Sequence, residues 1–317
     1  MGRFLAKRLL SSLVTLFLVA TFVFAIVNVL PGNPGRQLLG PQAPETEVVK
    51  LNERLGVNRP LVTQYVSSIS NMLTLDFGKS FVSNKDVVEE VTKPLVRSAK
   101  LALLALVITI PLGIGAGIFA ARRQNKFADR AVVMASVSTS SVPEFVSATI
   151  IASLFCVTWK FGFVFATPPD GSSFFLQLRY LIFPAMAMVL LYFGYIARMT
   201  RVGVINALQS DYVRTATMKG LAPSKVMRTH VLRNALVPTI TVISTQIGYL
   251  LGSIIGVERV FNYQGIGLTI TDAVKSKNMP ILQGTVVLVA FVYIIANLLA
   301  DLLIAYLNPR VRLGGSR

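Results

Sequence analysis

The amino-acid sequence predicts an all-α, polytopic membrane protein with six transmembrane helices. Of its 317 residues, 53% are hydrophobic and only 14% are charged, whereas soluble domains carry about 25% charged residues. The mean hydropathy is +0.64. Long apolar runs recur along the chain, and each approaches the ~20 residues that a helix needs to cross the hydrocarbon core of a bilayer. We therefore expect a single transmembrane domain over residues 1–317.

Six segments meet this length with at most one charged residue each. They are residues 9–30, 101–121, 131–159, 180–197, 236–257 and 281–307. The third is long enough to be tilted or broken at Pro143, and the fourth is short and contains Pro184. Basic residues precede the first segment, as in a signal peptide, but signal-peptide cores span only about 7–15 residues. The first segment is therefore expected to remain as a helix.

The net charge of +17 does not indicate a nucleic-acid partner, because the basic residues lie between the apolar runs. With the amino terminus inside, the four predicted cytoplasmic segments hold 17 lysines and arginines, against five in the two short external loops. The cytoplasmic segments are 1–8, 122–130, 198–235 and 308–317, and the external loops are 160–179 and 258–280. Because cytoplasmic loops are enriched in basic residues, both termini are predicted to be cytoplasmic.

The long segment 31–97 follows the first span and is predicted to be an external insertion. It opens with Pro31-Gly32-Asn33-Pro34, which is a strong helix stop. Residues 45–55 then alternate charged and apolar side chains, a pattern typical of short amphipathic helices. We expect this insertion to be folded against the outer face of the bundle.

The cytoplasmic loop 198–235 is predicted to contain two short helices. Ser210 or Asp211 can cap the first, which runs to Lys219, and Gly220 allows a left-handed turn. Pro223 can begin the second helix. A basic, amphipathic hairpin of this kind either rests on anionic membrane lipid or docks a cytoplasmic partner, and the pattern alone leaves both readings open.

Residues 211–220 resemble the cytoplasmic coupling loop of ABC importer permeases, most closely those of the oligopeptide, dipeptide and nickel transport family. The general pattern of that loop is Glu-Ala-Ala, then three residues, then Gly. In this sequence, Ala216 and Gly220 match the pattern, whereas Arg214 and Thr215 stand where it has Glu and Ala. Further resemblance, in the family's order, covers nearly the whole chain. The matching segments are 31–34, 55–61, 64–65, 76–80, 261–268 and 308–310.

The resemblance implies the first type of permease subunit in an ATP-driven importer that moves peptides, or a related small solute, into a bacterial or archaeal cell. It implies as partners a second permease, one or two cytoplasmic ATPase subunits that hold ATP and Mg²⁺, and an extracytoplasmic solute-binding protein. The residues implied to couple transport to the ATPase share the first short helix and its turn. They are Asp211, Tyr212, Arg214, Thr215, Ala216, Lys219 and Gly220.

The sequence offers no site for chemistry within this chain. Gly78-Lys79-Ser80 lacks the preceding glycine of a phosphate-binding loop, because position 73 is leucine. The single cysteine, Cys156, excludes a disulfide within the chain, and the single histidine, His230, excludes a multi-histidine metal site. We therefore expect no catalytic residue, no metal and no cofactor here, and an energy source on another subunit.

Two features of the spans are candidates for the solute path. Glu144 and Asp301 are acids at membrane depth, where a charge needs a partner or a polar cavity. Glu144 is the path candidate, with a structural hydrogen bond as the alternative, and a structural role is expected for Asp301. Gly248, Gly252 and Gly256 share one helical face and either line the path or pack helices together.

Two other functions compete with the importer subunit. A self-sufficient secondary carrier or channel commonly has inverted repeats or several intramembrane ionisable groups, but this sequence has two intramembrane acids and no visible repeat. A membrane-embedded enzyme needs a nucleophile with a base, or a set of metal ligands. A phosphate-loop ATPase encoded next to this chain would favour the importer.

Overall fold

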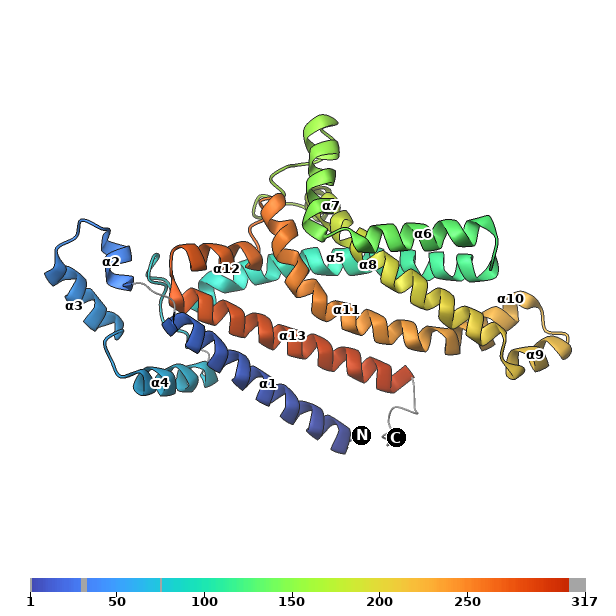
Figure 1. The fold of residues 1–317 in the computed structure, drawn as a ribbon, viewed down its shortest axis with the longest axis horizontal. Helices are drawn as coiled ribbons and strands as arrows, with labels where there is room; N and C mark the ends of the chain where they lie inside the picture. Colours follow the sequence, from blue (N-terminus) through green and yellow to red (C-terminus); the bar gives the residue numbers. More distant parts are fainter. Residues whose placement is uncertain (1, 30–32, 75, 308–317) are drawn as a thin grey trace. The chain divides into compact units, whose positions relative to one another are not determined.

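The computed structural model describes residues 2–29, 33–74 and 76–307, and within them the fold is helical apart from one isolated bridge between Lys79 and Asp86 (Figure 1). In this described part of the chain, four helices are long and apolar enough to cross a membrane, and the number rises to six if each of two bent helix pairs counts as one span. The predicted polytopic, all-α fold is confirmed.

The chain forms two compact units. The first contains residues 1–99 and 264–295, and the second contains residues 100–263 and 296–317. Two long helices, α5 (Val87–Arg122) and α13 (Met279–Leu307), contribute residues to both.

The first unit contains α1 (Gly2–Val29), the insertion, and the start of α5 and α13. The insertion forms the short helices that its sequence predicts: α2 (Pro34–Leu39), α3 (Glu45–Leu55) and α4 (Leu61–Leu73). It ends earlier than expected, because residues 87–97 are already the first turns of α5. The predictions for residues 30–32 and 308–317 concern segments outside the described residues.

A small apolar core organises this unit. Val87 and Val91 of α5 are fully buried against Ile266 of α12 (Ile266–Lys275) and Ile281 of α13. The Ser98 hydroxyl accepts a hydrogen bond from the Ile266 N–H over 2.7 Å. These contacts tie the start of α5 to α12 across 168 residues of sequence.

The second unit is built around α8 (Phe174–Leu208), which packs against α6 (Phe127–Ser141) and α11 (Leu232–Val260). Glycines bring these helices close together. A Cβ atom on Gly194 would lie 2.1 Å from the Ser136 carbonyl oxygen of α6, and one on Gly203 would lie 2.2 Å from the Ala235 carbonyl oxygen of α11. The two contacts leave no room for any side chain at these positions.

The third predicted span is broken where the sequence suggested. After α6, the chain bends by 100° at Val142 and Pro143 and continues as α7 (Glu144–Ile151) and a π-helical segment, η1 (Ala152–Thr158). The fourth span is longer than predicted, because α8 continues past residue 197 to Leu208. Residues 198–208 are therefore part of a long helix and not of a separate loop.

Candidate functional site

The predicted coupling segment forms a helical hairpin at one end of the second unit. Its first helix is α9 (Asp211–Met218), and Gly220 then turns the chain with a φ of +75°. The second arm is α10 (Pro223–Val226) followed by η2 (Met227–Val231), which leads into α11. Ser210 occupies the N-cap position of α9, but its hydroxyl donates backwards to the Ala207 carbonyl over 2.5 Å and caps no N–H of α9.

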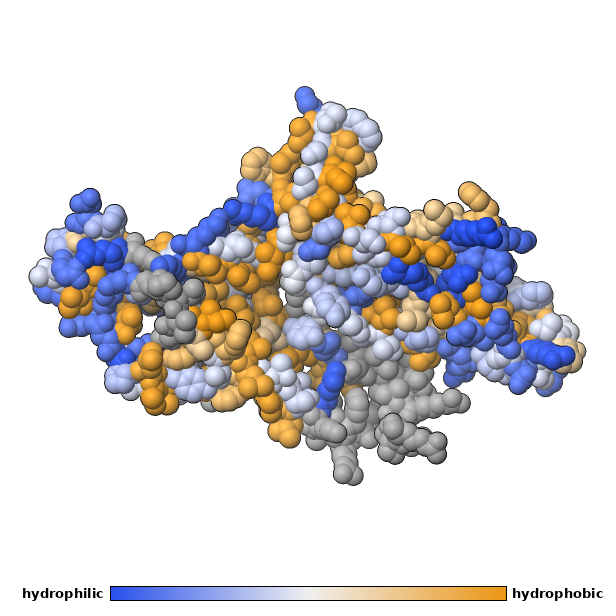
Figure 2. Space-filling model, viewed as in Figure 1, coloured by the Kyte–Doolittle hydropathy of each residue, from blue (hydrophilic) through white to orange (hydrophobic). Residues whose placement is uncertain are grey.

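The hairpin has a buried face and an exposed face. Val213 and Ala216 of α9 pack with Val226 and Val231 of the second arm and with Val204 of α8. Six of the seven predicted coupling residues are exposed, and the seventh, Ala216, is buried in this small core. The exposed ones are Asp211, Tyr212, Arg214, Thr215, Lys219 and Gly220. Figure 2 shows hydrophilic side chains interspersed with paler and apolar ones over α9 and α10.

An ion pair that the sequence did not reveal braces the helix that carries the hairpin. Arg201 of α8 donates to both carboxylate oxygens of Asp129 in α6, over 2.5 and 2.7 Å. The Asn125 backbone N–H donates to the same carboxylate over 2.9 Å, and Asp129 is only 2% exposed. The one signal in the sequence is that Asp129 is the only acid in the basic segment 122–130.

A cavity of about 630 Å³ lies in the second unit, among α7, α8 and α11. We call it the tyrosine cavity, because three tyrosines line it together with an acid, an amide and a glycine. These six residues are Glu144, Tyr192, Tyr195, Gln246, Tyr249 and Gly252. Sequence reasoning missed a signal for this cavity. Within two apolar runs, polar aromatic or amide residues stand three positions apart: Tyr192 with Tyr195, and Gln246 with Tyr249.

Of the residues predicted to line the solute path, the structure brings Glu144 and Gly252 together and places Gly248 apart from them. Glu144 is the first residue of α7, immediately after the bend, and it lines the tyrosine cavity with Gly252. A Cβ atom on Gly256 would lie 3.2 Å from the Phe145 Cβ, so Gly256 packs against α7. Gly248 is half-buried and does not line the cavity. The side chain of Asp301 lies outside the described residues.

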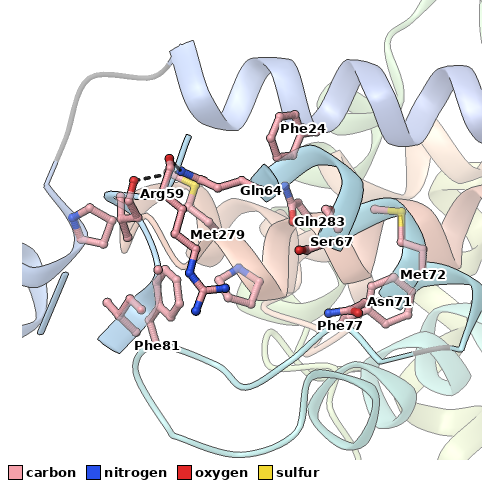
Figure 3. A pocket seen from close by; sticks show the side chains of 16 residues that line it. Phe24, Arg59, Gln64, Ser67, Asn71, Met72, Phe77, Phe81, Met279 and Gln283 are labelled. Carbon is pink, nitrogen blue, oxygen red and sulfur yellow. Dashed lines mark hydrogen bonds between the residues drawn. The ribbon is translucent and has the colours of Figure 1, made fainter. Parts of the chain in front are cut away.

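A second, smaller cavity of about 310 Å³ lies in the first unit, among α1, α4, the loop before α4 and the start of α13. Figure 3 shows Arg59 extending into it beside Phe81, with Asn71 and Gln283 also lining the space. The described residues of its lining include one cation, Arg59, and no acid. The cavity therefore favours a neutral or anionic partner. Among the described residues, no group of three or more histidine, cysteine or acidic side chains is placed to hold a metal ion.

Apolar helices of spanning length, a basic hairpin with an exposed face and a polar cavity between the helices together define a multi-pass membrane permease. Models of known families match nearly all of the chain. Residues 113–313 match the binding-protein-dependent transport system inner membrane component, and residues 1–102 match the amino-terminal part of such components. The chain belongs to this family, which consists of permeases of ABC transporters.

Curated relatives are similar over almost their full length. The "Probable peptide ABC transporter permease protein y4tP" of Sinorhizobium fredii is 33% identical and covers 98% of this chain and 100% of the relative. The "Glutathione transport system permease protein GsiC" of Escherichia coli is 34% identical, covering 98% of this chain and 99% of the relative. A crystal structure of an amino acid ABC transporter with histidines aligns with a TM-score of 0.49 at 16% identity, covering 69% of this chain and 92% of that chain.

Proposed function

We propose that this chain is one of two permease subunits of an ATP-driven importer that brings peptides, or a related small solute such as glutathione, into the cell. The observation that carries this proposal is the similarity to relatives with those named solutes, at 33% and 34% identity over 98% of the chain. ATP and Mg²⁺ would bind to one or two separate ATPase subunits, and a solute-binding protein would deliver the solute from outside.

In this proposal the hairpin carries force between the ATPase and the membrane helices. The exposed face of α9 is free to contact an ATPase subunit, while Val213 and Ala216 are packed against the second arm and α8. A short helix held in this way moves as a rigid body, because its buried side chains resist displacement. Movement of α9 would therefore be transmitted to α8 and α11.

The tyrosine cavity is the proposed part of the solute path. It lies beside the bend between α6 and α7, and it is contributed by α7, α8 and α11. Its lining is mixed, with tyrosine, glutamine and glutamate side chains, as expected where a polar solute passes helices that are otherwise apolar. Gly252 contributes open space to this cavity, since a Cβ atom there would meet nothing within 4 Å.

The sidedness follows from the distribution of basic residues. The hairpin and both termini are proposed to be cytoplasmic, and residues 31–86 to face the outside, where the solute-binding protein docks. The cavity around Arg59 belongs to this outer segment, and its single positive charge suits an acidic side chain of that protein.

Co-purification in mild detergent tests the composition of the complex. Tagged at its amino terminus, the chain is expected to bring down a second permease and at least one ATPase with a phosphate-binding loop. The complex should hydrolyse ATP, and the purified chain alone should not. Isolation of the chain without any ATPase, combined with uptake driven by an ion gradient, would favour the self-sufficient carrier.

A further inference from the structure

One acid, Glu144, lines the tyrosine cavity. Glu144 is half-buried, and within the described part of the chain its carboxylate makes no hydrogen bond and no ion pair. Among the residues that the structure describes, no lysine, arginine or histidine lines the cavity. An isolated carboxylate at membrane depth is costly, and such groups in membrane proteins commonly mark the place where a cation binds or passes.

The aromatic walls of the cavity also favour a cation. Tyr192, Tyr195 and Tyr249 line it, and the face of a tyrosine ring attracts positive charge. Tyr192 is held in place, because its hydroxyl shares a hydrogen bond of 2.6 Å with the Ser253 hydroxyl of α11. The ring of Tyr195 already contacts the Arg198 guanidinium, 5.4 Å from the ring centroid, so Tyr192 and Tyr249 are the rings proposed to face the solute cation.

The cation that fits this lining is organic and not metallic. Among the described residues, Glu144 is the only acid in the lining, whereas tight sites for divalent metal ions usually combine more than one carboxylate, imidazole or thiolate ligand. The volume of about 630 Å³ exceeds what an ammonium group alone fills and lies within the range of ~300–1,000 Å³ that is usual for small-molecule sites. A short chain that carries the ammonium group at one end has room here.

We propose that the tyrosine cavity is a binding site for the protonated amino group of the transported solute, with Glu144 as its counter-charge and the tyrosine rings as its walls. This inference rests on the proposed function, because it names the chemical group by which the path recognises a peptide-like solute. Glu144 thereby makes a free ammonium group a requirement for tight binding within the permease, in addition to any selection by the solute-binding protein.

The test measures binding to the permease without the solute-binding protein. The complex of this chain with its partner subunits is placed in lipid nanodiscs and equilibrated with radiolabelled trialanine amide, which carries one positive charge, or with its neutral N-acetyl form. The unaltered complex is expected to bind trialanine amide at least about tenfold more tightly, as is typical for the loss of one hydrogen bond to a charged group. Glu144→Gln should remove this preference, and Glu144→Asp should retain most of it.

Three results would overturn the inference: no binding of trialanine amide to the unaltered complex, equal binding of the two forms, or a preference that survives in Glu144→Gln. Uptake by the complete transporter, assayed with trialanine and with glutathione, distinguishes a failure of the ammonium-site inference from a failure of the proposed function. If the transporter takes up peptide but the complex in nanodiscs shows no preference for the ammonium form, only the ammonium site is refuted. Failure to take up either solute refutes the proposed function.

A second pair of variants keeps the test independent of the Glu144 side chain. A Cβ atom meets nothing within 4 Å at Gly252 or at Gly115 of α5, but only Gly252 lines the cavity, so a leucine at Gly252 fills cavity space and one at Gly115 does not. Gly252→Leu should weaken binding of trialanine amide at least about tenfold, while Gly115→Leu should not change it. Equal binding by both variants would show that the solute does not enter this cavity.

Discussion

At the scale of single residues, Gly220 is the position at which the hairpin depends most on one residue type. Its φ of +75° lies in the left-handed region, and a Cβ atom there would meet nothing within 4 Å. The cost of a substitution is therefore conformational and not steric. That cost is about 1–2 kcal/mol for an ordinary residue, and the branched side chain of valine fits this region poorly.

We predict that Gly220→Val leaves the helices inserted but lowers uptake at least about tenfold, because the turn between the two arms shifts and α9 no longer meets the ATPase correctly. Gly220→Asn should retain most uptake, since asparagine adopts left-handed angles more readily. Gly171→Val is the matched control, because Gly171 has a φ of +76° and equally open surroundings. Normal uptake by Gly220→Val at matched expression would contradict the mechanical role of the hairpin and favour its resting on lipid.

At the scale of helices, the Asp129–Arg201 pair is predicted to hold α6 against α8. Arg201→Met leaves the carboxylate of Asp129 buried without its partner. Breaking a buried pair costs about 3–5 kcal/mol, and the lower end applies because the Arg201 side chain is 23% exposed. The midpoint of thermal unfolding in detergent should fall by at least about 5 °C.

The double variant Asp129→Asn with Arg201→Met supplies the control for this prediction. Without the buried charge, it should regain part of the loss, so that the two substitutions are clearly non-additive. Arg198→Met, three residues before Arg201 on α8, should have little effect. Additive losses in the double variant would mean that the ion pair does not couple the two helices.

Local chemistry explains which elements the sequence predicted. Pro143 lacks an N–H and interrupts the third span, and Gly220 permits the left-handed turn, so both breaks were visible in single residues. The end of α8 could not be predicted in this way. The charged residues after residue 197 suggested a loop, but the helix continues to Leu208. The Asp129–Arg201 pair joins residues that are 72 positions apart in the sequence. The tyrosine cavity forms only where α7, α8 and α11 meet. Neither feature could therefore be predicted from a local sequence pattern.

At the scale of the whole molecule, the sidedness of the chain makes a testable prediction. Cys156 is the only cysteine and is buried, so a Cys156→Ala background allows single cysteines to be placed at will. A cysteine at Gly171 should react with a membrane-impermeant maleimide in intact cells, and one at Lys219 should react only after the membrane is opened. Labelling of position 219 in intact cells would invert the topology.

This permease is proposed to work only with ATPase partners, and uptake into proteoliposomes tests that dependence most directly. The complex of this chain with its partner subunits is reconstituted with the solute-binding protein on the outside and ATP sealed inside, and accumulation of labelled trialanine and glutathione is measured. We predict accumulation of at least one of them against its gradient with ATP, and none with a non-hydrolysable ATP analogue. Equal accumulation with the analogue, driven by an ion gradient, would contradict the account.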